Sequence, residues 1–515
     1  MKYPIGIQTF EEIITGGYVY VDKTALIHRL IDTGKYYFLS RPRRFGKSLL
    51  TTTLEAYFLG KKRLFKGLAM EELEKDWVEH PVFHIDFSGA DYSDEGVLSN
   101  RLDLAMSRWE NEYGKNESEI HFGERFFGVI SRAKIQTGKQ VVILIDEYDK
   151  PLTDTIGLPE LQEKNRGTLQ GLYGVLKRAD SMIKFAFLTG VTRYGKLGIF
   201  SAANNPDDIS MTDRYAAICG ITETELHEYF DEEVKSFADE KNVSKDEMYA
   251  MLKKKYDGYH FSTDSEDVYN PFSLLGALKN RKLENKWFAT GTPTYLARIL
   301  KNNNYDLVKF SKTIAATQET METFGNGEEN ILAALYQSGY LTIQSYDGRK
   351  FYQLGFPNDE VEDGFVQCLM TEYSGKSAGT FDEDFLNLRN AIEKGDVDGM
   401  MTQIQLIMSQ IPFESSNPKL IEANFRNMLY LMVRSTGYHV SVEFPVLGGR
   451  IDVFFETADA AYIIECKRDL SAREALRQID EKKYAQKISS PDKRVVKIGM
   501  NFSTEERNLT EWAVE

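Results

Sequence analysis

The chain has 515 residues, of which 42% are hydrophobic, and it carries a formal net charge of −15. Such a length predicts several domains rather than one. The excess of acidic residues excludes a protein whose whole surface binds polyanions, so any nucleic-acid site must be a local basic patch.

Cysteine usage and hydropathy narrow the class of protein further. Three cysteines, Cys219, Cys368 and Cys466, lie far apart without metal-ligand spacing. This pattern fits a reducing cytosol and argues against a disulfide scaffold or a structural zinc cluster. The N-terminus lacks the apolar segment of a signal peptide, and no apolar run is long enough to span a membrane. We therefore expect a cytoplasmic protein without membrane contact, whose metal chemistry depends on carboxylates.

The first predicted strand, 36–40, runs into a loop that ends in Gly46, Lys47 and Ser48, and a helix follows. This order of strand, loop and helix is the context that a phosphate-binding loop requires. Backbone amides and the helix N-terminus would bind the anion, Lys47 would reach the β- and γ-phosphates, and the Ser48 hydroxyl would ligate Mg²⁺. The usual first glycine of such a loop falls on Arg41, which predicts a tighter or differently routed loop.

A second strand of this domain, 141–145, is apolar throughout and ends in Asp146 and Glu147. Continuous apolar runs of this kind are typical of buried parallel strands. Asp146 would hold Mg²⁺, and Glu147 would polarise the water that attacks the γ-phosphate. Together with the loop, this strand predicts nucleotide binding. Hydrolysis is a further expectation, and the sequence does not separate ATP from GTP.

A third apolar strand, 185–188, ends in Thr189, and Arg193 follows shortly after it. Thr189 occupies the place of a polar sensor of the γ-phosphate. Arg193 could stabilise charge in the transition state, and a structural or substrate-binding arginine is an equal alternative.

The middle of the chain is predicted to be mostly helical. Residues 222–313 mix charged and apolar positions at helical spacing, at the place where P-loop ATPases carry a helical lid. A helix over 330–337 and two strands around Asp347-Gly348 then predict a winged-helix-like module. Such a module binds DNA or packs beside an ATPase lid, and the few basic residues on its wing favour packing. Paired helices follow over 382–411.

Near the C-terminus, two predicted strands, 450–456 and 461–467, are joined by a four-residue turn. If the strand ends pair directly across this turn, the antiparallel register sets Asp452 opposite Glu465. Opposed residues have Cβ atoms about 4.5–5.5 Å apart on one face of a sheet. Alternation then places Lys467 on that same face.

Two carboxylates beside a lysine predict a site for a divalent cation. Mg²⁺ takes carboxylate oxygens and keeps several waters. A bound cation would stabilise charge on a phosphodiester under attack by water, with Lys467 to position or activate that water. The alternative is a hairpin with a surface salt bridge, which contributes little to stability. The apolar residues that surround the acids in both strands favour a buried sheet with a functional edge.

These C-terminal residues resemble the PD-(D/E)XK nuclease superfamily, with Asp452 followed by Glu465-Cys466-Lys467 as the (D/E)-x-K tripeptide. The resemblance implies that Glu422, on a preceding helix, is an additional metal ligand. It also implies that Gln478 matches a glutamine that follows the lysine strand in such nucleases. Ordinary polar helix residues remain an even alternative for both. From 467 to 497 the chain has ten Lys/Arg and five Asp/Glu residues, a basic stretch suited to a phosphate backbone.

The N-terminal half resembles the AAA-ATPase-like family, a bacterial branch of P-loop NTPases often fused to PD-(D/E)XK nucleases. The resemblance implies ATP and Mg²⁺ as cofactors, and an arginine at the place of the loop glycine is usual in this family. It also implies that Arg44 belongs to the nucleotide site. The matching segments are Tyr20-Val21-Asp22-Lys23-Thr24, Arg41-Pro42-Arg43-Arg44-Phe45-Gly46-Lys47-Ser48, Asp146-Glu147-Tyr148-Asp149-Lys150-Pro151, Thr189-Gly190-Val191-Thr192-Arg193, Tyr256-Asp257-Gly258-Tyr259-His260-Phe261 and Asn270-Pro271-Phe272-Ser273.

The predicted fold class is multi-domain α/β. We expect a P-loop AAA-like ATPase domain over 1–215, a helical lid over 216–315, a winged-helix-like module over 316–375 and a restriction-endonuclease-like α/β domain over 376–515. The expected cofactor residues are Arg44, Gly46, Lys47, Ser48, Asp146, Thr189 and Arg193. The expected catalytic residues are Glu147, Asp452, Glu465, Lys467 and Gln478, and the expected metal ligands are Ser48, Asp146, Glu422, Asp452 and Glu465.

The predicted function is an ATP-regulated, Mg²⁺-dependent nuclease. Its expected partner is nucleic acid, with DNA favoured over RNA, and a homo-oligomer is compatible with the sequence. Two alternatives remain open. One is a nucleotide-dependent switch or scaffold that grips DNA without cutting it, and the other is a DNA mobility or defence factor that cuts only with a partner.

Overall fold

The computed structural model describes residues 1–193, 206–287, 294–322, 331–377, 379–411, 418–446, 449–487 and 493–515, with the side chains of 294–295, 418–423 and 487 outside that description. The chain forms two compact units. The first combines residues 1–287 with 316–358, and the second combines 288–315 with 359–515. Each unit is mixed α/β, so the predicted fold class is confirmed.

The first unit is built on a five-stranded sheet in the order β2-β3-β4-β1-β5, in which neighbouring strands are parallel. Both faces of β3 are buried, as its apolar sequence predicts. The carboxyl ends of β1, β3 and β4 therefore meet at one edge of the sheet. The strands are β1 (Tyr36–Ser40), β2 (Val82–Asp86), β3 (Val141–Asp146), β4 (Ile183–Gly190) and β5 (Asp207–Asp208).

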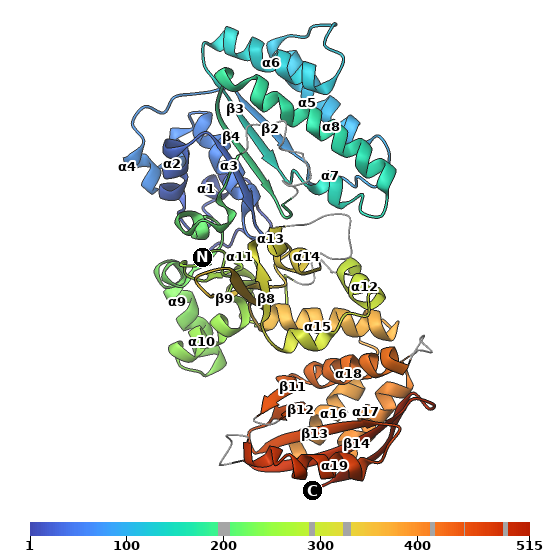
Figure 1. Ribbon diagram of the computed structural model, residues 1–515. Helices are drawn as coiled ribbons and strands as arrows, with labels where there is room; N and C mark the ends of the chain where they lie inside the picture. Colours follow the sequence, from blue (N-terminus) through green and yellow to red (C-terminus); the bar gives the residue numbers. More distant parts are fainter. Residues whose placement is uncertain are drawn as a thin grey trace. The chain divides into compact units, whose positions relative to one another are not determined.

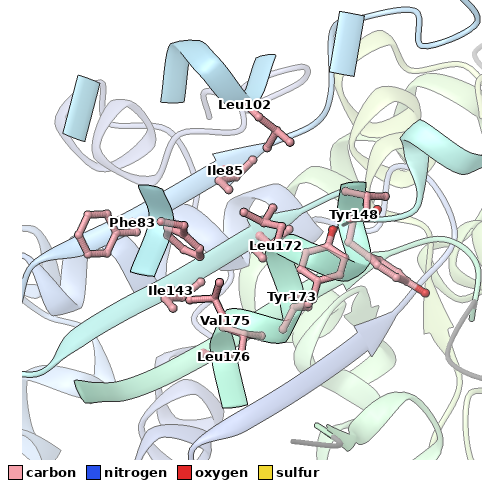
Figure 2. Packing of buried hydrophobic residues seen from close by; sticks show 14 of the residues in the cluster. Phe83, Ile85, Leu102, Ile143, Tyr148, Leu172, Tyr173, Val175 and Leu176 are labelled. Atoms are coloured by element: carbon pink, nitrogen blue, oxygen red, sulfur yellow. Dashed lines mark hydrogen bonds between the residues drawn. The ribbon is translucent and has the colours of Figure 1, made fainter. Parts of the chain in front are cut away.

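Helices cover both faces of this sheet (Figure 1). One face packs against α5 (Val97–Tyr113), α6 (Phe122–Thr137) and α8 (Pro159–Arg178), and Figure 2 shows Phe83 and Ile143 from the strands meeting Leu172 from α8. The other face carries α3 (Lys47–Phe58), which starts directly after the loop that the sequence predicts to bind phosphate. Shorter helices complete this region: α1 (Phe10–Thr15), α2 (Thr24–Thr33), α4 (Ala69–Leu73) and α7 (Lys150–Thr153).

The part of the predicted lid that lies in the first unit contains three helices around an apolar cluster, so its helical character is confirmed. The rest of that segment, from residue 288 to 315, belongs to the second unit. Local sequence explains where these helices begin. Thr222 with Glu225 and Ser244 with Glu247 form capping boxes, and Asn270 caps the third helix before a proline. The elements are β6 (Ile221–Thr222), α9 (Glu223–Lys241), α10 (Lys245–Tyr256), β7 (Val268–Tyr269) and α11 (Pro271–Asn280).

The predicted hairpin around Asp347-Gly348 is also present. Asp347 accepts three backbone N–H bonds across the turn, and Gly348 adopts φ +73°, a conformation in which glycine is favoured. The hairpin joins a three-stranded sheet in the order β8-β10-β9. Its elements are β8 (Ile314–Thr317), α13 (Gln318–Glu322), α14 (Ile331–Gln337), β9 (Thr342–Tyr346) and β10 (Phe351–Gly355).

The second unit contains a five-stranded sheet in the order β11-β12-β13-β14-β15. Its pairs are antiparallel except β13 with β14, which are parallel and joined through α19 (Ala472–Glu481). The strands are β11 (Val440–Val446), β12 (Gly449–Glu456), β13 (Ala460–Arg468), β14 (Arg494–Ser503) and β15 (Asn508–Val514). The other helices are α12 (Thr294–Asn302), α15 (Asp359–Ser374), α16 (Asp382–Lys394), α17 (Val397–Ser409) and α18 (Pro418–Ser435).

Among the described residues, no helix combines the length and the apolar character that a bilayer crossing needs.

Candidate functional site

The loop between β1 and α3 places a lysine at the start of a helix. Gly46 precedes α3 with φ +93°, a left-handed conformation that glycine adopts without steric cost, and Arg44 also has a positive φ of 68°. The Lys47 ammonium is buried and donates hydrogen bonds of 3.0 Å to the carbonyl oxygens of Arg41 and Pro42. Burial lowers the pKa of Lys47, while nearby Glu147 and other acids oppose that shift.

Arg41, at the place of the usual loop glycine, is an internal anchor of the loop. Its guanidinium donates to four backbone carbonyls, including those of Ser40 at 2.9 Å and Ser210 at 2.8 Å. It also lies 4.0 Å above the ring of Phe261. Burial lowers the pKa of Arg41 to about 10. The loop is therefore routed around a buried arginine, which explains how it forms without the first glycine.

Two acids stand at the end of β3, where sequence reasoning expected them. Asp146 is buried and accepts a short hydrogen bond from the Thr189 hydroxyl at the end of β4. Glu147 adopts φ +51°, and burial raises its pKa, against the effect of Lys47. The structure thus gathers Lys47, Asp146, Glu147 and Thr189 at one edge of the sheet, as the motif order predicted.

Sequence reasoning missed Asp86. This residue ends β2 and pairs in register with Asp146 on the neighbouring strand, so a further acid stands at the same edge. Its carboxylate accepts bonds from the backbone and hydroxyl of Ser88 at 2.7 and 2.8 Å. The available signal was a short, largely apolar strand that ends in an acid, the pattern that marks Asp146.

Arg193 is held by groups within the first unit. Its backbone N–H donates to Gln337 at 2.8 Å, and its guanidinium lies 3.4 Å from Glu322 and 3.7 Å from Asp208. The side chain is buried. These contacts favour a structural role for Arg193 over stabilisation of transition-state charge or substrate binding.

In the second unit, the predicted register of the nuclease-like hairpin is confirmed. Glu456 pairs with Ala461 and Val453 pairs with Ile464, so Asp452 faces Glu465 across β12 and β13. The backbone N–H of Cys466 donates to Oδ2 of Asp452 at 2.8 Å.

A glutamine from α19 links the remaining two predicted residues of this site. The Gln478 side chain donates a short hydrogen bond to Glu465 and accepts one from Lys467. Lys467 Nζ lies 3.6 Å from Glu465 Oε1. Tyr484, which sequence reasoning missed, also interacts with Gln478. The four predicted residues Asp452, Glu465, Lys467 and Gln478 therefore form one cluster.

The electrostatics of this cluster suit a cation. Burial raises the pKa of Glu465, and the Asp452 charge raises it further, against Lys467. Burial likewise raises the pKa of Asp452. Oε2 of Glu465 is buried and has no hydrogen-bond partner within the described part of the chain. An unpartnered carboxylate oxygen facing a second carboxylate fits Mg²⁺, which needs only one or two protein carboxylates beside its waters.

The described side chains do not form a group of three His, Cys, Asp or Glu residues that could hold a metal. The expected additional ligand, Glu422, belongs to α18, but its side chain lies outside the described residues. The described part of the site thus offers the Asp452 and Glu465 carboxylates.

The fold and the clusters define a P-loop-type nucleotide-binding unit followed by a nuclease-like unit. Residues 4–200 match the family described as a predicted AAA-ATPase, and residues 420–512 match the PD-(D/E)XK nuclease superfamily. The chain is 34% identical over 528 residues to the uncharacterized protein in the vnfD 5′ region of Azotobacter chroococcum mcd 1, an alignment that covers 100% of this chain and 99% of the relative. The chain belongs to the family that joins a predicted AAA-ATPase domain to a PD-(D/E)XK nuclease domain, which confirms the resemblance.

Proposed function

We propose that this protein binds and hydrolyses ATP in its first unit and cleaves phosphodiester bonds of DNA with Mg²⁺ in its second. The observation that carries the nuclease proposal is the convergence of Asp452, Glu465, Lys467 and Gln478 from β12, β13 and α19. Two facing carboxylates with a lysine beside them are the groups that metal-assisted phosphodiester hydrolysis requires.

In the nucleotide site, we assign phosphate binding to the amides at the start of α3 and to Lys47. The Lys47 ammonium would exchange the Arg41 and Pro42 carbonyls for phosphate oxygens. Ser48 and Asp146 would hold Mg²⁺, with Thr189 orienting the Asp146 carboxylate through its hydrogen bond. Glu147 would accept the proton of the attacking water. Arg44, at its positive φ, would help shape the loop around the phosphates.

In the nuclease site, Asp452 and Glu465 would hold Mg²⁺, and Glu422 is proposed as a further ligand. Bound Mg²⁺ would supply Lewis-acid stabilisation of charge on the phosphate. Lys467 would hold the attacking water, and Gln478 would keep the lysine ammonium beside Glu465. Because burial and mutual repulsion disfavour two charged carboxylates here, a bound cation would stabilise their charged forms.

We further propose that nucleotide state controls cleavage. Its support is the packing of lid residues against the phosphate-binding loop: the Phe45 ring lies 4.7 Å from Tyr259 and 5.4 Å from Phe261, measured between ring centroids. The hairpin module also contacts the loop, because a Cβ on Gly339 would lie 2.6 Å from Pro42. A change at the loop would therefore act on both neighbours. The four-part division at 215, 315 and 375 remains part of this proposal.

The test is cleavage of plasmid and single-stranded DNA in Mg²⁺, with and without ATP. Glu465→Ala removes the cation site, and Asp459→Ala, an exposed acid in the same hairpin turn, is the matched control. DNA cleavage that requires both Glu465 and ATP supports the complete proposal. Cleavage at the same rate with and without ATP rejects the proposed regulation by nucleotide. DNA binding without cutting in every metal favours the switch or scaffold alternative. Cutting only after addition of cell extract favours a partner-dependent factor.

A further inference from the structure

Beside the carboxylate pair of the nuclease site, one acid holds two arginines. The Nη1–H of Arg426, on α18, donates a hydrogen bond of 3.1 Å to Oε1 of Glu443. The Nη1–H of Arg450, on β12, donates a hydrogen bond of 2.9 Å to Oε2 of the same carboxylate. Each oxygen of Glu443 therefore binds one guanidinium group. None of these three residues was singled out from the sequence as a site residue.

Strand register sets this trio next to the metal-binding carboxylates. Val442 pairs with Val453 and Phe444 pairs with Ile451, so Glu443 stands at the level of Asp452 on the neighbouring strand. Arg450 precedes Asp452 by two positions, and alternation directs both to one face.

Stability alone is a weak reason for this arrangement. The Arg450 side chain is 68% exposed, and exposed ion pairs contribute little to folding. Nε of Arg426 is buried and has no hydrogen-bond partner among the described side chains, an arrangement that costs free energy in a folded protein. A guanidinium has five N–H donors, so both arginines keep donors for a second anion. Each arginine gives Glu443 one charge-assisted hydrogen bond from Nη1, and guanidinium groups bind the oxygens of phosphate in the same way as those of a carboxylate.

We infer that Arg426 and Arg450 bind the phosphate backbone of duplex DNA beside the scissile bond, and that Glu443 holds the two guanidinium groups until phosphate replaces it. This inference rests on the proposed nuclease function. Together with Lys467, the two arginines place three positively charged side chains at one edge of the site. They supply the local basic patch that a chain of net charge −15 needs to approach a polyanion.

The test measures binding, with cleavage disabled by Glu465→Ala in all proteins. A labelled DNA duplex is titrated at several KCl concentrations in this parent and after adding Arg426→Gln, Arg450→Gln or both. Each substitution should weaken binding and reduce the slope of log Kobs against log [salt] by about 1, and the double variant by about 2. Arg389→Gln is the matched control, because Arg389 forms an exposed ion pair with Glu393 on α16. It should leave the slope unchanged.

The outcomes separate this inference from the proposed function. Unchanged slopes in both arginine variants overturn the inference, while metal-dependent cleavage by the unmodified protein would still support the nuclease. A parent that fails to bind duplex DNA at every salt concentration overturns the inference, and absence of cleavage by the unmodified protein rejects the nuclease independently. If the same titration with a labelled RNA strand shows the change of slope and the titration with duplex DNA does not, the assignment to DNA is overturned. If Arg426→Gln lowers the melting temperature, its effect on binding could come from a disturbed fold. The salt dependence of the Arg450→Gln variant, whose side chain is exposed, then decides the result.

Discussion

The backbone N–H of Cys466 donates to Oδ2 of Asp452 at 2.8 Å, across the two central strands of the nuclease-like sheet. This bond fixes one oxygen of a carboxylate that also faces Glu465. It favours the charged form of Asp452, yet burial exerts the larger effect and raises its pKa. The site therefore has carboxylates with defined positions and an unfavourable charge state until a cation binds.

The first prediction concerns stability and pH without metal. Glu465 has a raised pKa in the folded protein, so the folded state binds more protons than the unfolded state once the pH exceeds the ordinary Glu value of about 4.3. Stability from this group is complete below that value and falls as pH rises toward the folded pKa. In EDTA, the melting temperature of the wild type should therefore fall with pH more steeply than that of Glu465→Gln.

Magnesium provides the control for this effect. Because the cation stabilises charged carboxylates, excess Mg²⁺ should raise the wild-type melting temperature most at high pH. The Glu465→Gln protein should respond less. Equal pH profiles for the two proteins in EDTA would contradict the raised pKa.

The second prediction concerns Gln478. Its side chain holds both Glu465 and Lys467, so Gln478→Leu should disturb two groups without removing either. Loss of such a supporting contact typically costs about 10–100-fold in metal affinity or activity. Cleavage rates measured against Mg²⁺ concentration should fall by that amount, with DNA binding retained. Glu481→Ala, an exposed change on the same helix, should match the wild type.

Local patterns made much of the nuclease-like hairpin predictable. A four-residue turn and alternating apolar positions determine the register between Asp452 and Glu465, since a shift by one residue would turn the acids to the other face. Gln478 was reachable because it follows on the next helix, close in sequence. Glu443 and Arg426 were not, because their relation to Asp452 depends on how β11 and α18 pack.

In the first unit, too, contiguous motifs were predictable from the sequence, and contacts between residues far apart in the sequence were not. The strand, loop and helix around Lys47 are contiguous, so the sequence predicted them directly. The strand order was not readable, and with it the neighbouring positions of Asp86 and Asp146. Apart from Ser40, the backbone carbonyls that Arg41 binds belong to Ser210, Tyr215 and Ala216, and no local pattern connects these residues to the loop.

The third prediction separates ATP binding from hydrolysis. Glu147 lies at the end of β3 beside Lys47 and Asp146, and we propose it as the acceptor of a proton during attack on ATP. Glu147→Gln should retain ATP affinity and reduce hydrolysis by about 100-fold or more, since general base catalysis typically contributes about 10²–10⁴-fold to the rate. Equilibrium binding of a fluorescent ATP analogue and steady-state phosphate release measure the two quantities.

Lys47→Ala is the companion variant, because it should weaken the binding of ATP, whereas Glu147→Gln should slow only its hydrolysis. Removing the charged donor should weaken ATP affinity by at least about tenfold. Exposed Lys62, just beyond α3, gives the control Lys62→Ala. Normal hydrolysis by Glu147→Gln would contradict its assigned role.

The fourth prediction tests the arginine at the place of the loop glycine. Arg41→Gly restores the common loop residue, but it removes a buried guanidinium that serves four backbone carbonyls. Because buried acceptors left without donors each cost about 1–3 kcal/mol, the variant should lose at least about 3 kcal/mol of unfolding free energy. Urea denaturation of the full chain measures this loss. Arg43→Gly, an exposed position in the same loop, controls for added backbone freedom. A variant at Arg41 that equals this control in stability and binds ATP normally would show that the arginine is dispensable as an anchor.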